Sequence, residues 1–184
     1  MLETVVDKVI QSVSHAANLY YRLVILVAPL GSGKTTTLRE VSNRLAVPLV
    51  NVNLELSSRM LSLTATQRSL QIINILREIV NSYKKDVVLL DNIELLFDVS
   101  LKQKPLELLQ MLSRNKTIVV AWSGEIRYEG DGRQSSGAKL DASCDSFIIS
   151  QSPSLYLTYA TPDHPEYRRY PIKDFLVITI DKAK

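Results

Sequence analysis

The stretch Ala28-Pro29-Leu30-Gly31-Ser32-Gly33-Lys34-Thr35 stands between two segments of different character. The five residues before it, 23–27, are all apolar and rich in β-branched side chains. Such a run is typical of a central parallel strand that is buried on both faces. Residues 35–45, which follow, have the pattern of a helix. The quoted stretch is therefore predicted to be a glycine-rich turn that joins a buried strand to the start of a helix.

Strands and helices alternate on both sides of this turn. An amphipathic stripe precedes it, and Thr64 with Gln67 forms a capping-box pattern at the start of a later helix. Such alternation predicts an α/β fold of three layers, with a mostly parallel central sheet and helices on both faces. The further expected strands are 49–53, 87–90, 117–122 and 175–180, and the further expected helices are 64–80 and 105–112.

The length of 184 residues predicts a single domain over 1–184. Within it we expect an N-terminal amphipathic helix over 1–20 and a mobile glycine-rich loop over 125–142. Short additional strands are expected at 147–149 and 155–159. The last expected strand ends four residues before the final residue, so no C-terminal helical lid is expected.

Composition excludes several classes of protein. There are 22 basic and 19 acidic residues, and the net charge of +3 is too small to indicate nucleic-acid binding by itself. The single cysteine, Cys144, excludes an intrachain disulfide and a structural zinc cluster. No signal peptide and no apolar run of ~20 residues is seen, which predicts a soluble cytoplasmic protein without a membrane partner.

The quoted turn resembles a Walker A phosphate-binding loop, G-x-x-x-x-G-K-[ST], with Ala28 in place of the first glycine. A glycine-rich turn lets backbone N–H groups converge on phosphate oxygens, and the following helix adds the positive end of its dipole. Lys34 would contact the β- and γ-phosphates of ATP, and the Thr35 hydroxyl would bind Mg²⁺. The expected nucleotide-binding residues are Pro29, Leu30, Gly31, Ser32, Gly33, Lys34, Thr35 and Thr36.

A second motif, 87–91, has the Walker B pattern of a buried strand that ends in a carboxylate. Asp91 is placed to hold Mg²⁺ beside the first strand. Vigorous ATPases usually have a glutamate directly after this aspartate, whereas this chain has Asn92 there and its next carboxylate at Glu94. Glu94 is therefore either the catalytic base or a solvated acid at the start of a helix, with Asn92 to Glu94 serving a switch or a partner.

The strand 117–122 is followed by Ser123. In the additional-strand division of P-loop ATPases, the strand next to Walker B ends in a polar sensor residue near the γ-phosphate, and Ser123 occupies that place. The alternative is a serine that only ends a strand at a turn. The predicted catalytic residues are thus Lys34, Asp91, Glu94 and Ser123, with Thr35 and Asp91 as the Mg²⁺ ligands.

Residues 20–124 resemble the AAA+/STAND-like side of the additional-strand P-loop ATPases. The stretches 91–96, 157–160 and 164–167 are more specifically similar to the BrxF family, the small P-loop proteins of type 3 BREX phage-defence systems in prokaryotes. This resemblance implies ATP and Mg²⁺ as cofactors. It also implies other defence-system proteins or self-association as partners, with DNA reached through the complex.

The expected function is that of an ATP-binding regulatory or assembly subunit that hydrolyses ATP slowly or when stimulated. Without a lid, a cation for the γ-phosphate would come from another chain, with Arg168 and Arg169 as first candidates and Arg114 next. A small phosphotransferase is an alternative, although its lid would hold only Arg127 and Arg133. A second alternative is an interaction module that binds nucleotide without hydrolysing it.

Overall fold

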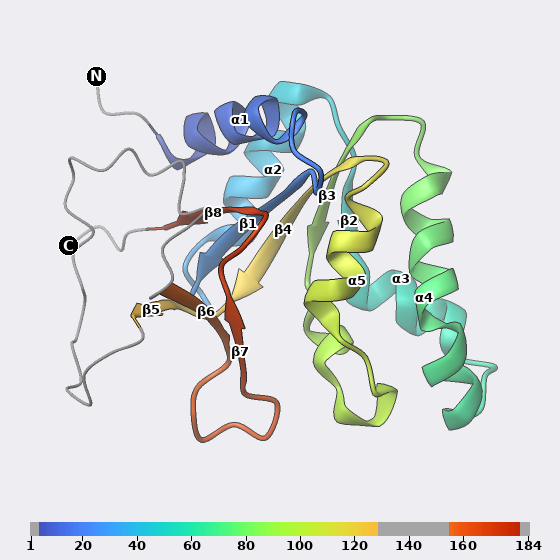
Figure 1. The fold of residues 1–184 in the computed structure, drawn as a ribbon. Coiled ribbons are helices and arrows are strands. Elements are labelled where there is room, and N and C mark those ends of the chain that lie inside the picture. The colour runs from blue at the N-terminus through green and yellow to red at the C-terminus, as the bar shows by residue number, and fades with distance from the viewer. Residues whose placement is uncertain (1–3, 129–154, 181–184) are drawn as a thin grey trace.

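The chain builds a parallel sheet and a smaller antiparallel sheet, which lie next to each other in the computed structural model (Figure 1). The structure describes residues 4–128 and 155–180. The helices are α1 (Val5–Ala16), α2 (Lys34–Leu45), α3 (Val52–Met60), α4 (Ala65–Ser82) and α5 (Pro105–Leu112), with 3₁₀ turns η1 (Glu94–Phe97) and η2 (Val99–Leu101). The strands are β1 (Leu23–Ala28), β2 (Leu49–Asn51), β3 (Val87–Asp91), β4 (Thr117–Ser123), β5 (Ile126–Tyr128), β6 (Leu155–Tyr159), β7 (Arg168–Pro171) and β8 (Leu176–Thr179).

The larger sheet has five parallel strands in the order β2-β3-β4-β1-β8. The predicted parallel α/β sheet is therefore confirmed. The strand that ends in Asp91 was expected beside the first strand. This expectation is wrong, because β3 does not lie beside β1. Strand β4 lies between them and pairs with β1 from Leu23 opposite Ile118 to Ala28 opposite Ser123. An inserted strand of this kind is what the resemblance to the additional-strand division implies.

Helices cover both faces of the larger sheet, as expected. All six residues of β1 are buried, and they alternate between the two faces. Val24 and Leu26 pack with α1 and α2, whereas Leu23, Ile25 and Val27 pack toward α3, α4 and α5. Figure 1 shows α1 and α2 on one side of the sheet and the other three helices on the opposite side.

The start of α4 follows the sequence prediction. The Thr64 hydroxyl accepts from the Gln67 N–H at 3.3 Å, and the Gln67 carboxamide oxygen accepts from the Thr64 N–H at 2.9 Å. A capping box of this kind satisfies two N–H groups that a helix leaves without partners. Pro105 begins α5, where its missing N–H costs nothing. None of the described helices combines the length and the apolar character needed to cross a lipid bilayer.

Two predicted elements have different bounds. The strand expected over 49–53 ends at Asn51, whose side-chain oxygen accepts from the Leu54 N–H at 3.1 Å and caps α3. This cap begins α3, a helix that was not predicted because the apolar and polar residues of 49–53 alternate as they do in a strand. The helix expected over 1–20 ends at Ala16 within the described part of the chain.

The smaller sheet is antiparallel, in the order β5-β6-β7. Its β6 confirms the strand expected at 155–159, but β7 was not predicted. Strand β5 occupies residues 126–128 of the predicted loop 125–142, so that part of the prediction is wrong. The remainder of that loop and the strand expected at 147–149 lie outside the described residues.

Candidate functional site

The carboxyl ends of β1, β3 and β4 lie at one edge of the larger sheet, which we call the carboxyl edge. The loop after β1, Asp91 at the end of β3 and Ser123 at the end of β4 meet there. Ala28 lies opposite Ser123 in the sheet, and its carbonyl oxygen accepts from the Gly124 N–H at 3.3 Å. Ligands of parallel α/β sheets bind at this edge.

The loop between β1 and α2 leaves its backbone N–H groups available. Gly31 and Gly33 have φ values of 76° and 84°, in the left-handed region that favours glycine. A Cβ atom added at either residue would meet nothing within 4 Å, so the space over the loop is open. No side chain caps α2, and its first turn contains no acidic residue. The arrangement suits an anion at the positive end of the helix.

Lys34 is folded into this loop and is only 8% exposed. Its Nζ donates to the carbonyl oxygens of Ala28 at 2.9 Å and Pro29 at 2.8 Å. Burial lowers the pKa of Lys34, while the nearby carboxylates of Glu94 and Asp91 oppose this shift. The ammonium group is therefore bonded to the loop carbonyls and has two carboxylates in its neighbourhood.

Asp91 is the last residue of β3 and Glu94 follows the strand, and the two side chains are buried to different degrees. The Asp91 side chain is nearly buried, and its Oδ1 accepts from the Asn92 N–H at 3.0 Å. Glu94 begins η1, is half-buried, and its Oε1 accepts from the Ser123 hydroxyl at 3.2 Å. Because β4 lies between β1 and β3, it places Ser123 where it contacts Glu94. The four predicted catalytic residues are thus gathered at the carboxyl edge.

The residues at this edge fit ATP and Mg²⁺. Thr35 and Thr36 are exposed in the first turn of α2, and Asp91 supplies a carboxylate from β3. Among the described residues, no three His, Cys, Asp or Glu side chains gather as a metal site of their own. Mg²⁺ does not need one, since it usually takes one or two protein ligands and completes its shell with phosphate oxygens and water.

One family model matches the chain, that of the ATPase family associated with various cellular activities (AAA), over residues 24–125. The match covers more than half of the chain. The chain belongs to the AAA family. The matched part of this AAA protein begins in β1 and ends just after Ser123, so it contains all four predicted catalytic residues. No curated protein and no solved structure matches the chain.

Sequence reasoning missed one residue that shapes the site of this AAA protein. Asn53, at the start of α3, donates its backbone N–H to the carbonyl oxygen of Asn92 at 3.0 Å. Its side-chain oxygen accepts from the Leu95 N–H at 2.9 Å. Asn53 therefore fixes both sides of the turn that carries Glu94, including Asn92 at a φ of 52°. In the sequence, Asn53 is only one polar residue of an alternating run.

The smaller sheet fixes Ser123 from its other side. The Ala160 N–H donates to the Ser123 carbonyl oxygen at 3.2 Å, and the Trp122 indole N–H donates to the Thr158 carbonyl oxygen at 2.8 Å. At Gly124 the two sheets approach so closely that a Cβ atom would lie 1.8 Å from the Thr158 oxygen. The last residues of β4 in this AAA domain are therefore locked to β6.

The arginines proposed to act in trans lie in two places. Arg168 and Arg169 are on β7, and the Arg169 guanidinium lies 4.0 Å from the ring centre of Tyr156. Arg114 lies before β4, at the end of the sheet opposite the phosphate loop, with its guanidinium 5.5 Å from the ring centre of Tyr20. Action of any of them on a second chain stays a prediction.

Proposed function

We propose that this AAA protein binds ATP with Mg²⁺ and hydrolyses it slowly by itself, and that a partner or self-association raises the rate. The observation that carries the proposal is the gathering of Lys34, Asp91, Glu94 and Ser123 at the carboxyl edge, next to a helix start that no side chain caps. This combination provides groups for phosphate, for a divalent cation and for proton transfer within one site.

Binding uses the loop and Lys34. The N–H groups of the loop and of the first turn of α2 would hold the phosphates, and Thr35 and Asp91 would hold Mg²⁺. Lys34 would exchange its bonds to the Ala28 and Pro29 carbonyls for bonds to phosphate oxygens. When bound, ATP supplies the phosphoanhydride bond and Mg²⁺ neutralises charge that develops on the phosphates.

Proton transfer would fall to Glu94, whose carboxylate would accept a proton from a water molecule that attacks the γ-phosphate. In the described structure its Oε1 is held by the Ser123 hydroxyl. We infer that this is a resting arrangement, because the base must turn from Ser123 toward the water before it acts. A slow rate in isolation follows from that step and from reliance on a cation of another chain, with Arg168 and Arg169 as first candidates.

The wider role we propose is that of a regulatory or assembly subunit in a prokaryotic phage-defence complex of the BREX kind. What supports it is the resemblance of 91–96, 157–160 and 164–167 to the BrxF family. Other defence proteins would then be its partners, and DNA would be reached through the complex. The genes beside this one test the proposal, because a BREX subunit should be encoded together with the other proteins of its system.

The phosphotransferase alternative loses support at the start of the predicted lid. Arg127, one of its two arginines, forms an ion pair with Glu125 at 3.0 Å instead of standing free for an acceptor phosphate. The other, Arg133, lies outside the described residues.

Phosphate release from ATP, measured over a wide range of protein concentration with and without Mg²⁺, tests the ATPase. We expect turnover well below the ~10 s⁻¹ typical of enzymes, rising with concentration. Asp91→Ala should abolish the Mg²⁺-dependent part, whereas Asp163→Ala, at an exposed turn, should keep it. A fast rate that does not depend on concentration would contradict the need for a second chain. Binding without hydrolysis under every condition would favour the non-hydrolysing alternative.

A further inference from the structure

The amino ends of β1, β3 and β4 meet at the edge of the sheet opposite the phosphate loop (Figure 1). The loops before these strands, residues 17–22, 83–86 and 113–116, form what we call the amino edge. Hydrogen bonds join them: the Arg22 N–H donates to the Ser113 carbonyl oxygen at 3.0 Å, and Lys116 Nζ donates to the Lys85 carbonyl oxygen at 3.1 Å. Three segments far apart in the sequence thus make one surface.

This surface is strongly basic, unlike the chain as a whole. Its three loops contain five cations and a single acidic residue, Asp86, against 22 basic and 19 acidic residues overall. The loop before β8 adds one charge of each sign, Lys173 and Asp174. None of the five cations forms an ion pair within residues 4–128 and 155–180. These five are Arg22, Lys84, Lys85, Arg114 and Lys116.

Aromatic rings lie among these charges. The Tyr20 side chain is 71% exposed, and its ring meets that of Tyr21 edge to face with 4.8 Å between the ring centres. The Arg114 guanidinium lies 5.5 Å from the centre of the Tyr20 ring and 5.7 Å from that of Tyr21. An exposed tyrosine beside a guanidinium offers a flat surface for stacking and a positive charge for a phosphate. Tyr83, half-buried, stands in the neighbouring loop.

We propose that the amino edge binds single-stranded nucleic acid, with an unpaired base stacked on Tyr20 and the backbone phosphates along the cations. Single strands are favoured over duplexes because only unpaired bases are free to stack on a protein ring. An acidic protein would use the charges but would leave Tyr20 without a role. The proposal goes beyond ATP binding and uses none of the residues at the carboxyl edge. The two edges are separated by the length of β1, six residues or about 20 Å.

The experiment is fluorescence anisotropy of a labelled oligothymidine longer than ~16 nucleotides, with an oligouridine and a DNA duplex as further arms. Binding should weaken with salt, with a slope of ~0.7 per phosphate contact in a double-logarithmic plot. Comparison of the DNA and RNA arms identifies which single strand is preferred. Duplex DNA should bind more weakly than either.

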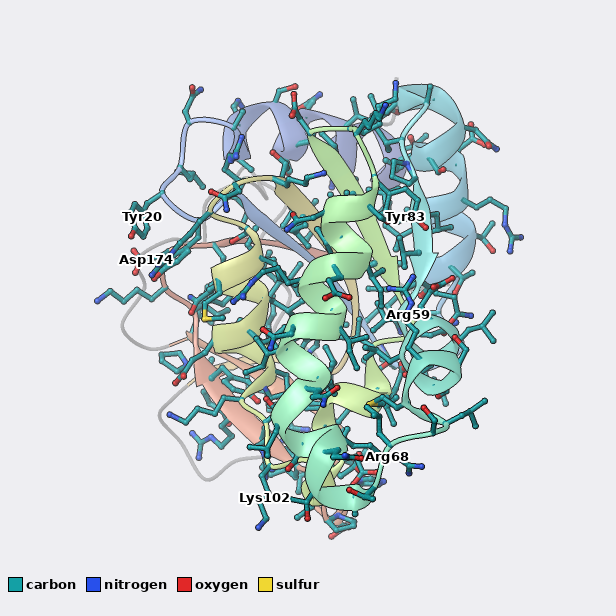
Figure 2. The ribbon with its side chains drawn as sticks, turned by 90° about the vertical axis from the view of Figure 1, so that its right-hand side faces the viewer. Tyr20, Arg59, Arg68, Tyr83, Lys102 and Asp174 are labelled. Atoms are coloured by element: carbon teal, nitrogen blue, oxygen red, sulfur yellow. The ribbon has the colours of Figure 1, made fainter. Side chains whose placement is uncertain are left out.

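Matched variants separate stacking from charge. Tyr20→Ala should weaken binding about tenfold, whereas Tyr20→Phe, which keeps the ring, should bind like the wild type. Lys84→Glu should weaken binding and lower the salt slope. Lys102→Glu makes the same charge change far from the amino edge and should have little effect. Figure 2 shows Lys102 at the opposite end of the molecule from Tyr20 and Tyr83. Lys34→Ala should keep the binding, so a failure here is distinct from a failure of the ATP site.

The proposal is overturned if the Tyr20→Ala variant, shown by a thermal melt to be folded, binds the oligonucleotides as tightly as the wild type does. Equal affinity for duplex and single strand would overturn it too. So would a polyglutamate peptide that competes as well as the oligonucleotide, because the surface would then recognise acidic chains in general.

Discussion

The two edges of the parallel sheet carry positive charge in contrasting ways. At the carboxyl edge, Lys34 is buried, bonded to carbonyl oxygens and faced by the carboxylates of Asp91 and Glu94. At the amino edge, five cations from three loops have no described carboxylate partner, and Tyr20 is open to solvent. The first arrangement holds one charge in a fixed position, which suits chemistry on a phosphate. The second presents several charges, of which those of Lys84, Lys85 and Arg114 are exposed, and this suits an extended polyanion.

The largest expected effect is on ATP turnover, from a substitution that changes the carboxyl edge and leaves the amino edge intact. Glu94→Gln should lower ATP turnover by about 10²–10⁴-fold, because the amide cannot accept a proton as a carboxylate does. ATP affinity and oligonucleotide affinity should stay within a few-fold. Steady-state phosphate release checks this, with Glu78→Gln on the exposed side of α4 as the control. Unchanged turnover would mean that Glu94 is not the base.

Lys34→Ala is expected to weaken ATP binding by at least ~10-fold, because hydrogen bonds to a charged group contribute about 1.5–3 kcal/mol each. Isothermal titration measures the affinity, and a thermal melt shows whether the variant is folded. If the variant binds ATP like the wild type, the phosphate loop is wrongly assigned. A parallel loss of oligonucleotide binding would show that the two edges are not independent.

Gly124→Ala sharpens the comparison by disturbing only the end of β4 that belongs to the carboxyl edge. Its Cβ would meet the Thr158 backbone oxygen at 1.8 Å, so the two sheets must move apart. We expect the free energy of unfolding to fall by about 1–3 kcal/mol, and turnover to fall with it as Ser123 moves. Urea unfolding followed by tryptophan fluorescence measures the stability. An unchanged midpoint would contradict the close contact of the two sheets.

The smallest effect is a pH dependence that comes from Lys34. Burial holds its pKa in the folded protein below the ordinary value of 10.5, so the folded chain releases this proton at a lower pH than the unfolded chain does. Between the folded pKa and 10.5 the unfolded state binds more protons, and this contribution to stability therefore rises with pH. Melting temperatures of the wild type and Lys34→Met, compared from neutral pH to 10.5, check it. As the pH rises, the melting temperature of the wild type should increase relative to that of Lys34→Met. A relative decrease would contradict the lowered pKa of Lys34.

The sequence predicted the candidate site best where the functional residues belong to short motifs of consecutive residues. The phosphate loop follows a buried strand, and Asp91 and Ser123 are the last residues of two others, so their meeting at one edge could be predicted from the order of elements. Asn53 could not be found in this way, because its role depends on bonds to Asn92 and Leu95, about forty residues further along the chain. Local patterns do not encode such partners.

Pairing between distant segments of the chain also explains why β7 and the amino edge were not predicted. Strand β7 is a polar segment among prolines, and it becomes a strand only because β6 pairs with it. The amino edge is invisible in the net charge of +3, since its cations are spread over loops that only the folded sheet brings together. Residue order predicted the carboxyl edge, whereas the three-dimensional structure was needed to see the amino edge.

The position of Trp122 gives the protein an intrinsic optical reporter. It is the single tryptophan of the chain, it is fully buried, and its indole is bonded to β6 and flanked by the rings of Phe97, Tyr159 and Tyr170. All indole emission therefore originates one residue before Ser123. A movement of β6 away from β4 would change the wavelength and intensity of that emission, so the junction between the two sheets can be followed in unlabelled protein during a single turnover.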